Sequence, residues 1–171
     1  MRALVSLLAL ALVACGQTPE PTAEAPEVAA EEVAPSPFIG AYTAMSTTAM
    51  SITGDLDASA DVLSFGKGFR IEGGRVDANV AGDTDLSAGG GTINSGSGIQ
   101  VSDVELRRIE NVRIAADAPS PNLCGGATAS YVILGRNADT LTLQIFSGAD
   151  APGPNAHDTQ LCGIYNYMPA A

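Results

Sequence analysis

The most constraining feature of this chain is an alternating run near its C-terminal end. Apolar and polar residues alternate over Thr140–Phe146, which reads TLTLQIF. A period of two places one set of side chains on each face, so this segment is predicted to be a strand with one face against a core. Two further apolar runs, Ala129–Leu134 and Leu161–Tyr167, flank it, with turn-rich residues between them. The segment from Cys124 to Tyr167 is therefore predicted to hold three strands joined by turns.

Short β-type runs also recur upstream, and no long apolar stripe with the helical period is present. This pattern predicts an all-β fold, either an antiparallel β-sandwich or a closed barrel of about eight strands. The predicted upstream strands are Ala41–Thr53, Val62–Phe65, Phe69–Glu72, Arg75–Val80, Ile99–Leu106 and Ile109–Ala115. The stretch Ala81–Gly98 has three consecutive glycines and few apolar side chains, so it is expected to be a mobile loop or a poor edge hairpin.

The N-terminal residues Met1–Ala14 have the form of a signal peptide. Arg2 supplies the positive charge, and an apolar run of 11 residues follows over Ala3–Val13. That run is shorter than the roughly 20 residues that a membrane-spanning helix needs.

The signal peptide ends in Leu12-Val13-Ala14-Cys15, which resembles the lipobox of bacterial lipoproteins. The resemblance implies cleavage before Cys15 and attachment of lipid to its sulfur and nitrogen. Gly16 in the next position implies the outer membrane, with the domain in the periplasm. The alternative is ordinary secretion with cleavage near Ala14 and a free Cys15 thiol.

Residues 15–37 are predicted to be the lipidated cysteine and a linker. The segment Gln17–Pro37 contains five prolines and five glutamates, with no lysine or arginine. Such a composition cannot bury enough apolar surface to order itself, and proline and like charge keep it extended. The linker is expected to hold a single domain, Phe38–Ala171, away from the membrane.

The domain is acidic. It carries 14 Asp and Glu residues against 7 Lys and Arg residues, which gives a charge of −7. Nucleic acid and anionic lipid are poor partners for such a surface. The membrane is expected to be contacted only through the lipid on Cys15, and the identity of a protein or small-molecule partner is left open.

With Cys15 lipidated, Cys124 and Cys162 are left as an even pair in an oxidising compartment, and a disulfide between them is predicted. The pair is too far apart along the sheet for a flat three-strand meander, so a bridge predicts a closed or strongly bent structure. A metal or redox role is less favoured, because the chain has no Cys-x-x-Cys motif and a single histidine, His157.

Two tyrosines near the C-terminal end are candidate partner contacts. Tyr165 and Tyr167 share one face of the last predicted strand, while Cys162 and Ile164 share the other. If the cysteine face is the core, the tyrosines point outward and suit contact with partners or sugars. The alternative is a second buried face.

An acidic stretch and an arginine-rich cluster can each be interpreted as a binding site, the first for calcium and the second for an anion. The spacing Asp55-x-Asp57-x-Ser59-x-Asp61 is like the first half of a calcium loop, but it lacks the glycine and the glutamate at the later positions, so no metal site is predicted. The cluster Glu105, Arg107, Arg108, Glu110 and Arg113 contains three arginines that could receive a carboxylate or phosphate. Pairing with neighbouring glutamates is the favoured interpretation.

The predicted function is a non-catalytic binding or interaction domain, because none of the common catalytic motifs occurs; no catalytic residue and no cofactor are expected. The chain resembles small proteobacterial lipoproteins through its lipobox and its LCGIYNY ending. Phe38–Tyr42 also resembles the Gly-x-Trp start of lipocalins, with Tyr42 in place of tryptophan. That resemblance implies an alternative function as a carrier of a small apolar ligand. A carboxylate-based hydrolase is a second alternative.

Overall fold

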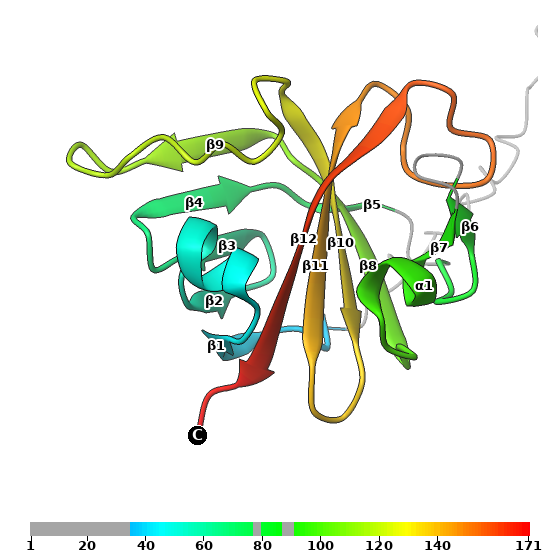
Figure 1. Ribbon diagram of the computed structural model, residues 1–171, viewed down its shortest axis with the longest axis horizontal. Coiled ribbons are helices and arrows are strands. Elements are labelled where there is room, and N and C mark those ends of the chain that lie inside the picture. The colour runs from blue at the N-terminus through cyan, green and yellow to red at the C-terminus, as the bar shows by residue number, and fades with distance from the viewer. Residues whose placement is uncertain (1–34, 77–79, 87–90) are drawn as a thin grey trace, which may run out of the picture. The chain divides into compact units, whose positions relative to one another are not determined.

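The computed structural model describes residues 35–76, 80–86 and 91–171. The predicted signal peptide, Cys15 and nearly all of the predicted linker lie outside these residues. The described domain is built on one antiparallel sheet of ten strands, curled strongly into a half-barrel, with a separate two-stranded sheet beside it (Figure 1). The all-β antiparallel class is therefore confirmed, and so is the strong bending that the disulfide predicted.

The large sheet contains ten strands. They are β1 (Gly40–Ala44), β2 (Leu56–Ala58), β3 (Val62–Phe65), β4 (Phe69–Glu72), β5 (Arg75–Val76), β8 (Asp103–Arg108), β9 (Asn111–Ile114), β10 (Ala129–Arg136), β11 (Leu141–Gly148) and β12 (Thr159–Pro169). The small sheet consists of β6 (Asp85–Leu86) and β7 (Gly91–Thr92), and the helices are a π-helical turn η1 (Ala49–Thr53) and α1 (Ile93–Ser97).

The strand order is β5-β8-β10-β11-β12-β1-β2-β3-β4-β9. The two end strands of this order, β5 and β9, each belong to a longer bent segment. One segment is β4 and β5, separated by two glycines, and the other is β8 and β9, separated by Ile109 and Glu110. These segments pair with each other in both halves, β4 with β9 and β5 with β8. Bending two paired segments in this way lets one continuous sheet wrap around a core.

Gly73 marks the bend between β4 and β5. A Cβ atom at this position would lie 1.9 Å from the carbonyl oxygen of Arg108, so only glycine fits. On either side of it, the Glu110 N–H donates to the Glu72 carbonyl at 2.9 Å, and the Arg108 N–H donates to the Gly74 carbonyl at 3.1 Å. The close approach of the two backbones at this glycine keeps the pairing continuous through the bend.

The interior of the half-barrel is an apolar core. It is lined by alternate residues of the strands, such as Val132 and Leu134 on β10 and Leu141, Leu143 and Ile145 on β11. These last three are the residues whose alternation predicted the central strand, and all three are fully buried. Phe38, just before β1, is fully buried in the same core.

A second, smaller core lies on the outer face of β8, β10 and β11. It contains Leu106, Tyr131, Ile133 and Phe146 from these strands, together with residues of the insertion between β5 and β8. The insertion contributes Leu86 and Ile93. The expectation of a mobile loop over Ala81–Gly98 is therefore wrong for its described part, which holds β6, β7 and α1 packed on the sheet; the short hairpin was anticipated.

The upstream strand predictions differ from the structure in several places, and the predicted strand Ile99–Leu106 corresponds to β8, which begins only at Asp103. The predicted strand Ala41–Thr53 is β1 followed by η1. The chain leaves the sheet at Ser46, whose hydroxyl accepts the Ala49 N–H at 3.1 Å and whose carbonyl accepts the Met50 N–H at 2.9 Å. The acidic stretch considered as a calcium loop contains β2, and Asp55, just before this strand, accepts the Ala44 N–H at 2.9 Å.

Candidate functional site

The predicted disulfide is present. The Cys124 and Cys162 sulfurs are 2.00 Å apart and their Cα atoms 4.7 Å apart. Cys124 lies in the segment between β9 and β10, and Cys162 lies in β12, so the bond links elements that are not neighbours in the sheet. The bond is part of the domain's structure, since both cysteines pack against the main core.

The two tyrosines proposed as partner contacts are buried, which corrects that prediction. Tyr165 is 1% exposed and Tyr167 is fully buried. They lie opposite Leu143 and Leu141 of β11, inside the half-barrel. The register shifts at Cys162, which has no partner on β11, and such a bulge changes which face the following residues present. Cys162 and the tyrosines therefore both pack against the main core.

The arginine cluster predicted from the sequence is divided by the sheet. Arg107 and Glu105 lie inside the half-barrel, opposite Val132 and Leu134, and are 1% and 2% exposed. Their ion pair is 2.6 Å long, and Arg75 lies 2.6 Å from the other Glu105 oxygen. Glu105 and Arg107 are paired with each other and closed off from solvent, while Arg75 is partly exposed. The buried pair belongs to the core and offers no binding surface.

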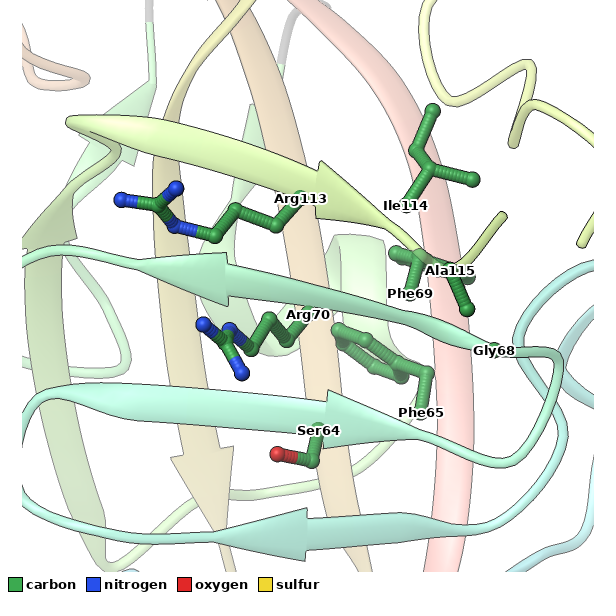
Figure 2. A pocket seen from close by; sticks show the side chains of 8 residues that line it. All are labelled: Ser64, Phe65, Gly68, Phe69, Arg70, Arg113, Ile114 and Ala115. Atoms are coloured by element: carbon green, nitrogen blue, oxygen red, sulfur yellow. The ribbon is translucent and has the colours of Figure 1, made fainter.

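Arg113 lies on the opposite, outer face and lines an open groove on the wall formed by β3, β4 and β9. The groove has a volume of about 420 Å³, and Figure 2 shows the side chains around it. Its lining residues are Ser64, Phe65, Gly68, Phe69, Arg70, Arg113, Ile114 and Ala115. Strand alternation explains this surface, because Phe69 and Ile71 of β4 point into the core while Arg70 and Glu72 point outward.

Two arginines form the polar end of the groove. Arg70 and Arg113 are directly opposite each other on β4 and β9, and their side chains are 53% and 58% exposed. In Figure 2 both guanidinium groups point away from the end of the groove that Gly68 and Ala115 mark. Like charges directly opposite each other repel, and Glu72 supplies a compensating negative charge from the same face.

Glu72 is bound to both arginines. Its carboxylate accepts from Arg113 Nε at 2.7 and 2.8 Å and from Arg70 Nε at 2.8 Å. The hydrogen bond from Arg113, then that from Arg70, holds the pKa of Glu72 below its ordinary value of 4.5. Within the described chain, both arginines make these bonds through Nε, so their terminal nitrogens are free to bind a further anion.

The other end of the groove is apolar. Phe65 and Phe69 stack beneath it with their ring centres 4.6 Å apart. Ile114 beside them is 43% exposed, which is unusual for a large apolar side chain opposite a buried phenylalanine. These apolar side chains lie on the core face of the sheet, whereas Arg70 and Arg113 lie on the outer face. The feature of the groove that suits an external ligand is therefore the arginine pair.

Other polar hollows are less suited to a ligand. A hollow of about 530 Å³ near β1 is lined by Arg136, among others. That guanidinium already donates to the Pro37 carbonyl at 2.5 Å and to Asp103 at 3.1 Å, and it lies 5.6 Å from the centre of the Phe38 ring. Its charge thus helps to hold the start of the domain in place.

Catalytic and metal-binding constellations do not form around the groove. Ser64 is the only hydroxyl among its lining residues, and no histidine lines it. His157 lies in the segment before β12, where its backbone N–H and that of Asp158 donate to Asp150 and lower the pKa of that carboxyl. In the described residues, no three His, Cys, Asp or Glu side chains are placed to hold a metal ion.

No helix in the part of the chain that the structure describes is long and apolar enough to span a membrane. No protein-family model, curated protein or solved structure matches this chain.

Proposed function

We propose that this protein is a lipoprotein, anchored to the outer membrane through Cys15, whose periplasmic β domain binds an anionic partner without catalysis. The observation that carries the binding role is the exposed pair Arg70 and Arg113, side by side on a domain whose charge is −7. Guanidinium groups with free terminal nitrogens bind carboxylate and phosphate groups well. The lipobox resemblance supports the anchor.

The architecture proposed with this function is a closed barrel of eight strands. Counting β4 with β5 and β8 with β9 as one strand each gives eight, and the pairing of those two segments supports closure of the sheet. A barrel has no long free edge except where strands diverge, so binding surfaces are expected on its outer wall and at such openings.

The carrier alternative is supported less well. A carrier needs an enclosed pocket of about 300 Å³ or more. Here large side chains occupy the interior where a ligand would lie, since those that are fully buried include Phe38, Leu56, Leu63, Tyr165 and Tyr167. A carboxylate-based hydrolase needs two acidic groups facing one cleft. Glu72 is a single carboxylate and is already bound by the groove arginines, so it does not supply such a pair.

The binding role is tested by titrating the purified mature protein, in detergent, with sulfate and with succinate. The variant carrying Arg70→Gln and Arg113→Gln should bind both anions at least about ten-fold more weakly, because it lacks the guanidinium donors. Arg108→Gln is the matched control, since Arg108 is exposed and carries the same charge but does not line the groove.

Calorimetry at low ionic strength gives the readout, because salt screens exposed charges. Equal affinity in the double variant and in the Arg108→Gln control would show that the groove does not bind anions, and the proposed function would then fail.

A further inference from the structure

β9 has a free edge. The Ala115 N–H donates to the Gly68 carbonyl at 2.8 Å, next to the paired residues Phe69 and Ile114. In an antiparallel pair, alternate residues direct their N–H and C=O groups toward the partner strand. Ala115 directs its N–H toward β4, so Arg113, two residues earlier, directs its backbone groups toward β4 as well. The backbone groups of Val112 and Ile114 point to the opposite edge. In the described part of the chain, nothing pairs with that edge.

The chain that follows β9 runs back beside it (Figure 1). A hollow of about 460 Å³ lies between them, lined by Val112 and Ile114 on one side and by residues 120–124 and 126–129 on the other. The returning segment contains Pro119 and Pro121, and proline has no N–H to donate. This composition explains why the segment runs beside the edge, across the hollow, without pairing with it as a strand.

The side chains on either side of this edge define what an added strand would meet. Arg113 lies on the outer face with its guanidinium exposed. Val112 packs against the main core, and Leu123 and Cys124 line the same hollow. Residues directly opposite each other in a sheet have their side chains on the same face. A strand beside β9 therefore places one residue against Arg113 and its neighbours against apolar groups.

We propose that the free edge of β9 binds an extended polypeptide segment in which acidic and apolar residues alternate. The segment adds a strand to the sheet, with its backbone paired to Val112 and Ile114 and an acidic side chain beside Arg113. Charge complementarity and the unpaired backbone groups together favour a peptide, because a small anion satisfies only the arginines. The choice of an acidic partner rests on the proposed anion-binding function; the strand pairing does not.

Binding is tested with a capped heptapeptide of alternating valine and glutamate and the mature protein in detergent. We expect the peptide to bind, and the same peptide with N-methylated valines to bind at least about ten-fold more weakly, because it has lost backbone donors. A peptide with lysine in place of glutamate should also bind at least about ten-fold more weakly.

A matched pair of variants tests the edge from the protein side. Ile114→Pro removes an outward N–H that β4 does not use, whereas Ile114→Val keeps it and remains β-branched. The proline variant should lose at least about ten-fold in peptide affinity, and the valine variant should stay within about three-fold of the parent protein. Far-UV circular dichroism and the urea unfolding midpoint of both variants report whether the domain is still folded.

The outcomes separate the two proposals. Peptide binding that survives both N-methylation and Ile114→Pro overturns strand addition, and if sulfate still binds through Arg70 and Arg113, the anion-binding function stands alone. Absence of peptide binding to a protein that binds sulfate also overturns strand addition. Peptide binding that N-methylation removes, but that Arg113→Gln leaves unchanged, supports the edge and overturns the acidic partner.

Discussion

Tyr165 and Tyr167 are the two most deeply buried tyrosines of the described residues. The Tyr167 hydroxyl lies 2.6 Å from the Thr53 hydroxyl, which in turn donates to the Ala49 carbonyl at 2.9 Å. The bond between the Tyr167 and Thr53 hydroxyls therefore ties β12 to η1 from inside the domain. Burial raises the pKa of both phenols above the ordinary value of 10.0.

The raised tyrosine pKa values predict a loss of stability at alkaline pH. A group with a higher pKa in the folded state contributes its full stability below its unfolded pKa and loses it as the pH rises toward the folded pKa. The free energy of unfolding should therefore fall as the pH rises above about 10. Urea unfolding at several pH values measures this slope, and it should be much shallower in the variant carrying Tyr165→Phe and Tyr167→Phe. An equally steep slope in that variant would assign the effect to other groups.

A second residue-scale prediction concerns Glu72, which competes with any external anion for Arg70 and Arg113. Glu72→Gln should strengthen sulfate binding by about three-fold or more, because the neutral amide attracts the guanidinium groups less. In the parent protein, the same gain should develop as the pH falls through the lowered pKa of Glu72. Calorimetric titrations across this pH range measure it; weaker binding in Glu72→Gln would mean that the carboxylate is needed to position the arginines.

The same carboxylate predicts the direction of the acid response. A depressed pKa contributes stability that is present above the unfolded value of 4.5 and is lost as the pH falls through the folded value. Acid therefore weakens the attachment of β9 to β4 while it frees the arginines for an anion.

At the scale of elements, the disulfide joins the segment before β10 to β12, across a sequence separation of 38 residues. β11 lies between β10 and β12 in the sheet, so the bond reaches over a strand that pairs with both. It also lies beside the hollow along β9, since Cys124 lines that hollow. The bond fixes the returning segment, which no strand pairing holds.

Removal of the disulfide should destabilise the domain without affecting its attachment to the membrane. For a loop of this length, chain entropy gives a loss of about 4 kcal/mol in the free energy of unfolding. Urea unfolding of the variant carrying Cys124→Ala and Cys162→Ala, compared with the parent protein, measures it. An unchanged unfolding midpoint would show that the bond contributes little to stability.

At the scale of the whole molecule, charge and anchoring act together. The proposed cleavage before Cys15 removes Arg2, so the proposed mature chain carries −12. A strongly acidic chain is repelled by anionic lipid surfaces, and its proposed attachment therefore depends on the lipid and not on the protein surface. Under this proposal, the lipid on Cys15 decides where the protein resides.

Cys15→Ser should release the protein from membranes, because it removes the thiol that accepts the diacylglycerol. Fractionation of cells measures the distribution, and mass spectrometry of the N-terminal peptide of the parent protein identifies the lipid. Arg108→Gln serves as a control that leaves the lipobox intact. An unmodified Cys15 in the parent protein would contradict the anchor.

Local patterns in the sequence determined much of the β-structure. The runs Val62–Phe65 and Phe69–Glu72 have the same bounds as β3 and β4, and the alternation over Thr140–Phe146 identified the buried face of β11. A period of two is a property of neighbouring residues, so it can be read without knowing the fold. The pairing of Cys124 with Cys162 was predictable because the third cysteine belongs to a separate N-terminal pattern.

The tertiary structure alone decided which of the charged and aromatic residues face solvent. Arg70 and Arg113 are 43 positions apart in the sequence and become neighbours only through the pairing of β4 with β9, while Arg107 is enclosed by the curl of the same sheet. One unpaired residue at Cys162 turned both tyrosines inward. Register, bulges and curvature depend on contacts between distant segments, and the energy of those contacts is not encoded in any local pattern.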